Sequence, residues 1–261
     1  MRKLIFTIAL LFAVATTLSA QEIIAHRGFH KASNGAHNSI GALVAAVESG
    51  FMVVEFDIVR TVDGERIVAH GPQHGNMRIA ESTLEELRTE PLLNGEAIPT
   101  LTEYLEVAAQ YPDLRLIVEI KGDIHEEESI SCAIVKEELE RLGLMPRATF
   151  ISFSKHACDI MTAEGMPTLY LNGDLKPREA KERGYTGINY HFSKYRKKSE
   201  WVRKAKREGL AVAVWTVNKE KDAKWAKRKG FDYITSDDPE MIKEILEQPK
   251  HQKSKKHNKE Q

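Results

Sequence analysis

The sequence predicts an α/β protein with a single (β/α)8 barrel of the TIM type and a short antiparallel hairpin extension after the second strand. Short runs rich in β-branched residues alternate with stretches whose apolar residues recur at helical spacing, a pattern typical of parallel strands joined by crossover helices. The length of 261 residues suits this interpretation, because such barrels occupy about 250 residues. No internal repeat and no Pro/Gly-rich linker divides the sequence, so we expect one barrel domain at residues 21–248.

Nine segments have the composition of strands. They are Ile23–Ala25, Met52–Val59, Arg66–His70, Leu114–Ile120, Ala148–Phe153, Thr168–Leu171, Gly187–Tyr190, Leu210–Val217 and Tyr233–Thr235. An eight-stranded barrel leaves one of them over, and Asp63-Gly64 identifies it. Asp-Gly between two apolar runs indicates a hairpin, and so short a link has no room for a crossover helix. We therefore expect Arg66–His70 to fold back antiparallel beside the second strand.

Helical spacing of apolar residues predicts helices between most of these strands. The clearest are Ser39–Glu48, Leu101–Gln110, Ser129–Leu142, His156–Ala163 and Trp201–Glu208. In barrels of this kind, reactive residues lie at the carboxyl ends of the strands, which form one rim of the barrel.

Residues 1–20 have the pattern of a secretory signal peptide. Arg2 and Lys3 precede an almost wholly apolar run, Leu4–Leu18, and Ser19-Ala20 offers small residues for cleavage. The run is shorter than the roughly 20 apolar residues that a membrane span needs. We therefore expect an exported protein, periplasmic or secreted, with no stable membrane insertion after the signal is removed.

The composition of the chain excludes some partners. Thirty-eight basic residues balance 38 acidic ones, so no net charge attracts nucleic acid, and no base-stacking motif is present. The Lys- and His-rich residues 249–261 are expected to form a flexible tail. Cys132 and Cys158 fall on apolar faces of expected helices, where buried free thiols are commoner than disulfides; the sequence leaves their pairing open.

Three carboxylates interrupt apolar strands near their carboxyl ends. Glu55 and Asp57 share one face of their strand, because strand side chains alternate with period two. Glu119 repeats the pattern in Leu114–Ile120. Buried carboxylates are costly without a neutralising cation, and a hard divalent ion with oxygen ligands supplies one. The alternative is that they form ion pairs with Arg27 or Lys121.

Two histidines are expected at the same rim. His26 follows the first strand, and His70 ends the folded-back strand. The unperturbed pKa of an imidazole is about 6.5, so one imidazole can be neutral while another is protonated at neutral pH. Displacement at phosphorus needs such a pair, with a base for the attacking oxygen and an acid for the departing one.

The series of motifs resembles the glycerophosphodiester phosphodiesterase family. The resemblance covers nearly all of Ile23–Pro239, in the family's order. It is carried by Ala25-His26-Arg27-Gly28, Val54-Glu55-Phe56-Asp57-Ile58, Thr61-Val62-Asp63-Gly64, His70, Ile98-Pro99-Thr100-Leu101, Val118-Glu119-Ile120-Lys121, Ser152-Phe153, Trp215-Thr216-Val217-Asn218 and Asp232-Tyr233-Ile234-Thr235-Ser236-Asp237.

The resemblance implies roles for five residues around the substrate. The positions matching His26 and His70 act as the acid/base pair, and those matching Arg27 and Lys121 help to hold phosphate. Trp215 is similar to an aromatic residue near the substrate entrance, with packing in the barrel as its alternative role.

The resemblance also implies a divalent cation, Ca²⁺ or Mg²⁺, held by Glu55, Asp57 and Glu119. Two departures from the family bear on this ion: His37 stands where the family has a glutamate, and Gly71 stands where it has an aspartate. Fewer carboxylates and an added imidazole make Mn²⁺ or Zn²⁺ alternatives. An exposed histidine without a role is the other interpretation of His37.

A third departure concerns the segment from Gly71 to Ile98. Many family members insert a small subdomain there, which helps to shape the alcohol pocket. This segment is short, and the sequence predicts only a loop and one helix, Thr83–Arg88. We therefore expect a more open site that accommodates larger diesters.

The function implied is metal-dependent hydrolysis of glycerophosphodiesters to glycerol 3-phosphate and an alcohol. One alternative is a lipid phosphodiesterase of the sphingomyelinase D type, which needs an apolar lip that the sequence does not show clearly. Another is a phosphodiester-binding protein without turnover. The presence of both histidines and all three carboxylates argues against the latter.

Overall fold

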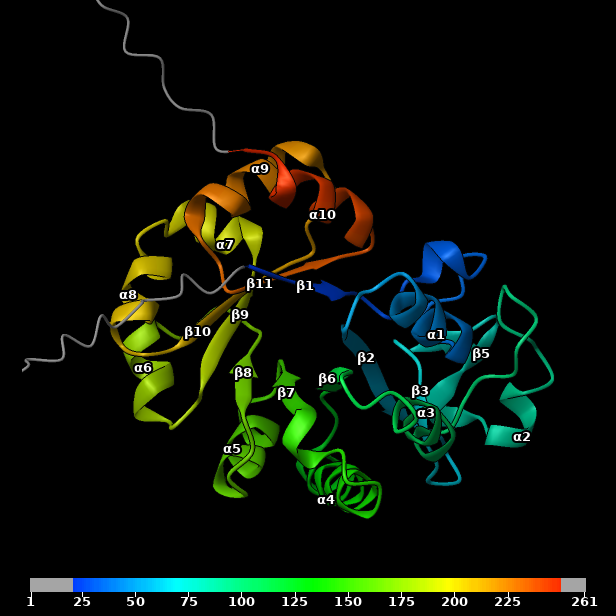
Figure 1. Cartoon of the computed structure of the whole chain (residues 1–261). Helices are drawn as coiled ribbons and strands as arrows, with labels where there is room; N and C mark the ends of the chain where they lie inside the picture. The colour runs from blue at the N-terminus through cyan, green and yellow to red at the C-terminus, as the bar shows by residue number, and fades with distance from the viewer. Residues whose placement is uncertain (1–20, 250–261) are drawn as a thin grey trace, which may run out of the picture.

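Eight parallel strands close into a TIM barrel in the computed structural model, which describes residues 21–249 (Figure 1). The strands are β1 (Glu22–Ala25), β2 (Val53–Arg60), β6 (Arg115–Ile120), β7 (Ala148–Ser152), β8 (Thr168–Tyr170), β9 (Gly187–His191), β10 (Ala211–Trp215) and β11 (Tyr233–Ser236). The predicted fold class is confirmed. The predicted signal peptide and nearly all of the predicted tail lie outside the described residues.

The barrel closes at a narrow joint between β1 and β2. One paired position, Ala25 with Val54, joins these strands, whereas β2 and β6 share six. Two hydrogen bonds extend the joint beyond the ladder: Arg27 N donates to Glu55 Oε2 at 2.9 Å, and Gly28 N donates to Glu55 O at 3.3 Å. Residues of the carboxyl rim therefore help to complete the barrel.

The predicted hairpin extension is present. β3 (Arg66–Val68) runs antiparallel to the end of β2, with Ile58 opposite Val68. The turn contains Gly64 at φ +89°, a conformation that glycine adopts without strain. The strand ends two residues earlier than predicted, so His70 lies in the loop beyond β3 rather than in the strand.

Ten α-helices surround the strands in the described part of the chain (Figure 1). They are α1 (Ile40–Glu48), α2 (Leu84–Leu87), α3 (Leu101–Ala108), α4 (His125–Arg141), α5 (Lys155–Ala163), α6 (Pro177–Glu182), α7 (Phe192–Lys197), α8 (Trp201–Arg207), α9 (Glu220–Lys229) and α10 (Pro239–Glu247). The five clearest predicted helices are confirmed, although α4 begins four residues earlier than expected. Within residues 21–249, none of the helices combines the length and the apolar character needed to cross a bilayer.

The segment between β3 and α3 is more ordered than predicted. Besides α2, it contains a two-stranded antiparallel sheet, β4 (Gln73–His74) with β5 (Met77–Arg78). A small apolar cluster fastens the segment to β3; its members are Ile67, Ile79, Leu87 and Ile98. The prediction of a plain loop was wrong because two-residue strands are too short to show an alternating pattern.

Apolar side chains fill the barrel below the carboxyl rim. One buried cluster draws on six strands and includes Ile24, Val53, Ile117, Ile151, Leu169 and Ala213. Two residues further along β2 and β6, the same inward face carries Glu55 and Glu119, because side chains alternate along a strand. The polar site therefore lies directly above a layer of apolar side chains inside the barrel.

Cys132 and Cys158 are free and buried, as the commoner of the two alternatives predicted. Cys158 Sγ lies 3.6 Å from Ser152 O. Burial raises the pKa of the Cys132 thiol to about 12, so this thiol stays protonated and packs as a small apolar group.

Candidate active site

A cavity of about 210 Å³ opens at the carboxyl rim of the barrel. The expected residues that line it are His26, Arg27, Glu55, His70, Glu119, Lys121 and Trp215. Two expected residues do not line it. Asp57 is fully buried and contacts Arg27 and Lys121, whereas His37 lies outside the cavity wall.

Glu55, Asp57 and Glu119 come together because β2 and β6 are neighbours in register. Asp57 lies opposite Glu119 in the ladder, and Glu55 points to the same face as Asp57. One carboxylate oxygen of each lies within 4.8 Å of the others, and all three residues are buried. Burial and repulsion among the carboxylates raise the pKa of Glu55 well above its usual range and that of Glu119 to about 7. A cation relieves this repulsion.

Two basic side chains neutralise part of the charge. Lys121 Nζ lies 2.6 Å from Asp57 Oδ1 and 2.5 Å from Glu119 Oε1. Arg27 Nε lies 3.3 Å from Asp57 Oδ2. Burial alone would raise the pKa of Asp57, but the two basic groups hold it below its usual range. The ion pairs considered from the sequence therefore exist for Asp57 and Glu119, but not for Glu55.

Glu55 keeps one oxygen free of hydrogen bonds. Its Oε2 accepts from Arg27 N at 2.9 Å and lies 3.9 Å from His26 Nε2. Its Oε1 is buried and meets no hydrogen-bond donor among residues 21–249. When all three carboxylates are ionised, their charge exceeds that of the two basic side chains by one. An orphaned oxygen within a carboxylate cluster is the donor set that a hard divalent cation takes, so these residues fit a metal ion.

An unusual backbone conformation positions Arg27 and Asn38. Both have positive φ, 56° and 59°, a conformation that costs a non-glycine residue about 1–3 kcal/mol. Asn38 N donates to Arg27 O at 3.0 Å. The Asn38 side chain donates to Asp57 Oδ2 at 2.9 Å and accepts from Asp57 N at 3.2 Å. Gly28 follows at φ 76°, where a Cβ would lie 2.6 Å from the backbone of Ala42, so only glycine fits.

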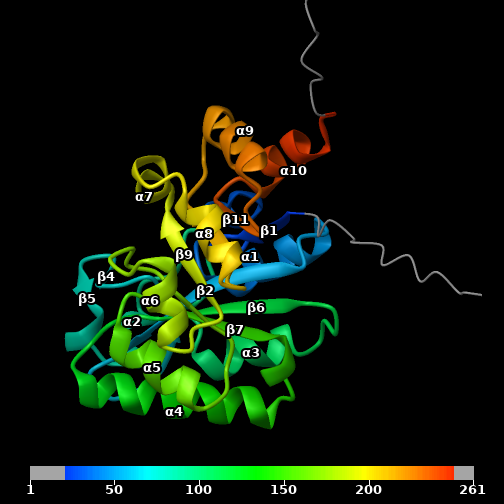
Figure 2. The same ribbon diagram turned by 90° about the vertical axis from the view of Figure 1, so that its left-hand side faces the viewer.

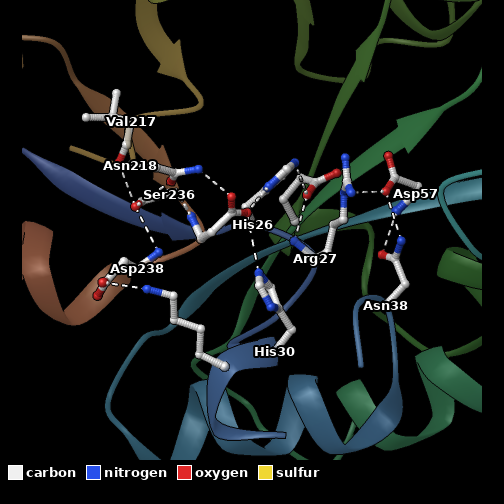
Figure 3. A network of polar contacts seen from close by, with 12 residues as sticks. His26, Arg27, His30, Asn38, Asp57, Val217, Asn218, Ser236 and Asp238 are labelled. Carbon is white, nitrogen blue, oxygen red and sulfur yellow. Dashed lines mark hydrogen bonds and ion pairs between the residues drawn. The ribbon is translucent and has the colours of Figure 1, made fainter. Parts of the chain in front are cut away.

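His26 is held by a carboxylate that follows the last strand. Its Nδ1 lies 2.6 Å from Asp237 Oδ1. The same oxygen lies 3.4 Å from His30 Nε2, and Asn218 Nδ2 donates to Asp237 Oδ2. Figure 3 shows His26 at the centre of this network. Burial alone would raise the pKa of Asp237, but the donors around it hold that pKa well below its usual range.

Asp237→Asn is expected to make the protein less stable at pH 7 by about 1–3 kcal/mol, because a carboxylate that accepts several hydrogen bonds is lost. The lowered pKa means that the carboxylate stabilises the fold above the unfolded-state pKa of 3.8, and that this contribution is lost as the pH falls below it. Urea unfolding between pH 3 and pH 7 measures the difference. We expect the gap between parent and variant to shrink below pH 4.

The control for this experiment is Asp113→Asn, at an exposed aspartate. This change should leave the stability gap near zero at every pH. A gap for Asp237→Asn that is constant with pH would show that folding does not lower the pKa of this carboxylate.

His70 lines the cavity from the loop that follows β3. The backbone before it is fixed to β2, since Ala69 N donates to Asp57 O at 3.1 Å. Partial burial and the positive charges of Lys121 and Arg27 lower the pKa of His70. The ring is therefore neutral near pH 7, the form that accepts a proton.

His37 stacks on His30, with ring centroids 3.7 Å apart and an interplanar angle of 19°. Partial burial, His30 and Arg27 lower the pKa of His37 to about 4, so it stays neutral at pH 6–7. Within residues 21–249, its nitrogens are not part of the ligand cluster around Glu55. The clustered donors there are all oxygen atoms.

An aromatic pair forms part of the cavity wall. Phe153 is exposed and meets Trp215 edge to face, with ring centroids 5.6 Å apart. Trp215 Nε1 also donates to Asn189 O at 2.9 Å. Trp215 therefore both packs in the barrel and lines the cavity, so its two predicted roles are compatible. Phe153 provides an apolar edge that the sequence did not make clear.

Sequence reasoning missed the residues that orient the site. Asp237 ends a motif that carries the family resemblance, and Asn38 directly follows His37, but no role was predicted for either residue. Asp237 directly follows a strand at the carboxyl rim, a position that could have identified it. Asn38 had no comparable signal, because its role depends on a left-handed backbone that brings it to Asp57.

Comparisons with known proteins find similar sequences and structures. Residues 26–241 match the model of the glycerophosphoryl diester phosphodiesterase family. A protein from Caldanaerobacter subterraneus subsp. tengcongensis, named glycerophosphodiester phosphodiesterase, is 28% identical over 84% of this chain and 95% of its own length. The crystal structure of a glycerophosphodiester phosphodiesterase from Parabacteroides distasonis has a TM-score of 0.83 and 36% identity, covering 87% of this chain and 97% of that one.

A more distant relative shares the fold. The structure of an Oleispira antarctica phosphodiesterase in complex with the product sn-glycerol-3-phosphate has a TM-score of 0.76 and 24% identity, covering 88% of this chain and 98% of that one.

Proposed function

The chain belongs to the glycerophosphoryl diester phosphodiesterase family, whose members are phosphoric diester hydrolases, and we propose that it hydrolyses glycerophosphodiesters to glycerol 3-phosphate and an alcohol. One observation carries this proposal. Two histidines, two basic side chains and a cluster of buried carboxylates meet at a single cavity. The basic side chains can bind a phosphodiester anion, and the histidines can transfer protons to and from its oxygens.

Arg27 and Lys121 bind the phosphate. Both line the cavity, and both are fixed by carboxylates rather than free to move. Their positive charge faces the oxygens on which negative charge develops during displacement. Charges held in place before the reaction lower its barrier because they need no reorganisation.

His70 and His26 divide the proton transfers. The lowered pKa of His70 leaves it neutral near pH 7, so we assign it the role of base for the attacking oxygen. His26 is held at Nδ1 by Asp237, which leaves Nε2 to protonate the departing alcohol. The attacking oxygen is that of water, or it is the glycerol 2-hydroxyl. Attack by the 2-hydroxyl expels the alcohol and forms a cyclic phosphate, which water then opens to give glycerol 3-phosphate.

Glu55, Asp57 and Glu119 hold a divalent cation. An all-oxygen donor set favours Ca²⁺ or Mg²⁺; Mn²⁺ and Zn²⁺ are the alternatives. When bound, the ion supplies positive charge to the phosphate oxygens.

The test is turnover of glycerophosphocholine by the purified protein, with and without a chelator. We expect release of glycerol 3-phosphate and choline in equal amounts, its loss with the chelator, and its recovery with excess Ca²⁺ or Mg²⁺. Hydrolysis of sphingomyelin or lysophosphatidylcholine without glycerophosphocholine turnover would favour the lipid-acting alternative. Saturable binding of glycerophosphocholine without product would identify a binding protein.

We also propose export of the protein, on the strength of the basic start, the apolar run Leu4–Leu18 and Ser19-Ala20. Cleavage after Ala20 would leave a mature chain beginning at Gln21. Intact-mass measurement of the protein from its native host checks this. A mass that includes residues 1–20 would contradict it.

A further inference from the structure

A second group of metal-ligating side chains lies outside the cavity, between the first turns of α4 and α5. Figures 1 and 2 show these two helices side by side. His125, Glu128 and His156 each offer one ligand atom there, and the three atoms lie within 4.8 Å of one another. We propose that these residues form a second divalent metal site, one that takes a borderline ion such as Zn²⁺.

The fold brings the three side chains together from two helices. His125 and Glu128 are three residues apart on α4, so they share a face of that helix. His156 is the second residue of α5. Its Nδ1 lies 3.0 Å from Glu128 Oε2. The rings of His125 and His156 stack, with centroids 4.2 Å apart and an interplanar angle of 13°.

Glu128 is held ready as a ligand. It is only 2% exposed, which is rare for a carboxylate. Ser154 Oγ donates to its Oε2 at 2.8 Å, and Asp123 N donates to its Oε1 at 3.2 Å. These bonds fix the orientation of the carboxylate, as supporting hydrogen bonds do around metal ligands.

The spacing of the ligand atoms suits a tetrahedral ion. Ligands about 2.0–2.2 Å from zinc stand roughly 3.3–3.6 Å from one another. His156 and Glu128 are already close to that spacing. A metal ion lies in the plane of each imidazole that binds it, so the His125 ring has to turn out of its stack on His156. His125 is exposed, which leaves its side chain room to do so. Three protein ligands leave the fourth position to water.

The donor atoms distinguish this site from the cavity. Two imidazole nitrogens and one carboxylate suit Zn²⁺ or Co²⁺, whereas the cluster of Glu55, Asp57 and Glu119 offers only oxygen. The positive ends of two helix dipoles face the site and oppose a cation. The full negative charge of Glu128 offsets these partial charges.

An ion here would tie together two loops of the carboxyl rim. One loop runs from Lys121 to α4, and the other runs from β7 through Phe153 to α5. Lys121 and Phe153 both line the cavity. The site would therefore hold the cavity wall in place without touching the substrate.

The test is calorimetric titration with Zn²⁺ in saturating Ca²⁺, using the full chain and its variants. We expect the parent to bind one Zn²⁺ in addition to any ion at the carboxylate cluster. His125→Gln and His156→Gln should each weaken that binding by about 100-fold, since each removes a ligand. Glu126→Gln removes a charge from an exposed neighbour on α4 and should bind like the parent. Co²⁺ in place of Zn²⁺ should give the visible absorption of a four-coordinate ion.

Two controls make the outcome decisive. Glu119→Gln alters only the carboxylate cluster, so its Zn²⁺ binding should persist. His125 is exposed, so its variant is expected to fold, which circular dichroism verifies. Residues 250–261 are common to the parent and all the variants, so any zinc that they bind contributes equally to every titration. Titrations of His125→Gln and His156→Gln that superimpose on the parent would overturn the proposal. Loss of all Zn²⁺ binding in Glu119→Gln would also overturn it, because the ion would then bind only at the carboxylate cluster.

Discussion

Replacing His26 or His70 with alanine is expected to lower kcat for glycerophosphocholine by about 10² or more, the usual scale for the loss of a general acid or base. Both rings line the same cavity. Asp237 orients His26, whereas partial burial and nearby positive charge lower the pKa of His70. KM should change less, because Arg27 and Lys121 remain to bind the phosphate.

A change of leaving group separates the two roles. The p-nitrophenyl ester of glycerol 3-phosphate releases a far more acidic alcohol than choline, which needs little help from an acid. We therefore expect His26→Ala to recover most of its lost rate with this ester. His70→Ala should stay slow with both substrates, because the attacking oxygen still needs a base.

The control for both histidine variants is His74→Ala. His74 lies in β4, away from the cavity, where its ring contacts Glu90 O. It should leave kcat near the parent value with either substrate. Near-normal turnover in folded His26→Ala or His70→Ala would remove that residue from the mechanism. The reverse pattern of rescue would exchange their roles.

Glu55→Gln and Glu119→Gln are each expected to weaken divalent metal binding by about 10-fold or more and to lower activity in proportion. Each change removes a negative charge from a cluster whose charge is only partly neutralised by Lys121 and Arg27. Glu55→Gln keeps an oxygen that can accept from Arg27 N, so the fold should largely persist. Asp57→Asn should also bind metal more weakly, with a larger loss of stability because Arg27 and Lys121 lose their shared partner.

Calorimetric titration with Ca²⁺, Mg²⁺ and Mn²⁺ measures these affinities. Glu48→Gln is the matched control, since Glu48 is an exposed residue at the end of α1. It should bind metal like the parent. If all three cluster variants also do so, the carboxylates are structural and the metal binds elsewhere.

The barrel and the carboxylate cluster could be predicted because they follow from local patterns. Strand side chains alternate with period two, so Glu55 and Asp57 had to share a face. Parallel strands end at one rim, so Glu119 had to lie near them. The Asp63-Gly64 turn identified the strand that runs antiparallel beside β2.

The network around His26 could not be predicted in the same way. His26 and Asp237 are 211 residues apart, and they meet because β1 and β11 are neighbours in the closed barrel. The lowered pKa of His37 was equally inaccessible, since it depends on partial burial and on the nearby charges of His30 and Arg27.

The narrow joint between β1 and β2 makes Glu55 serve two purposes at once. One paired position joins these strands, and the Glu55 side chain adds a bond to Arg27 N just beyond it. The same carboxylate faces the cavity with its other oxygen. A substitution of Glu55 is therefore expected to affect both the closure of the barrel and the proposed chemistry of the cavity. An apolar residue at position 55 would remove the bond to Arg27 N at this joint as well as the carboxylate of the cavity. A descendant of this protein that has lost activity but keeps the barrel should therefore still carry a hydrogen-bond acceptor at this position.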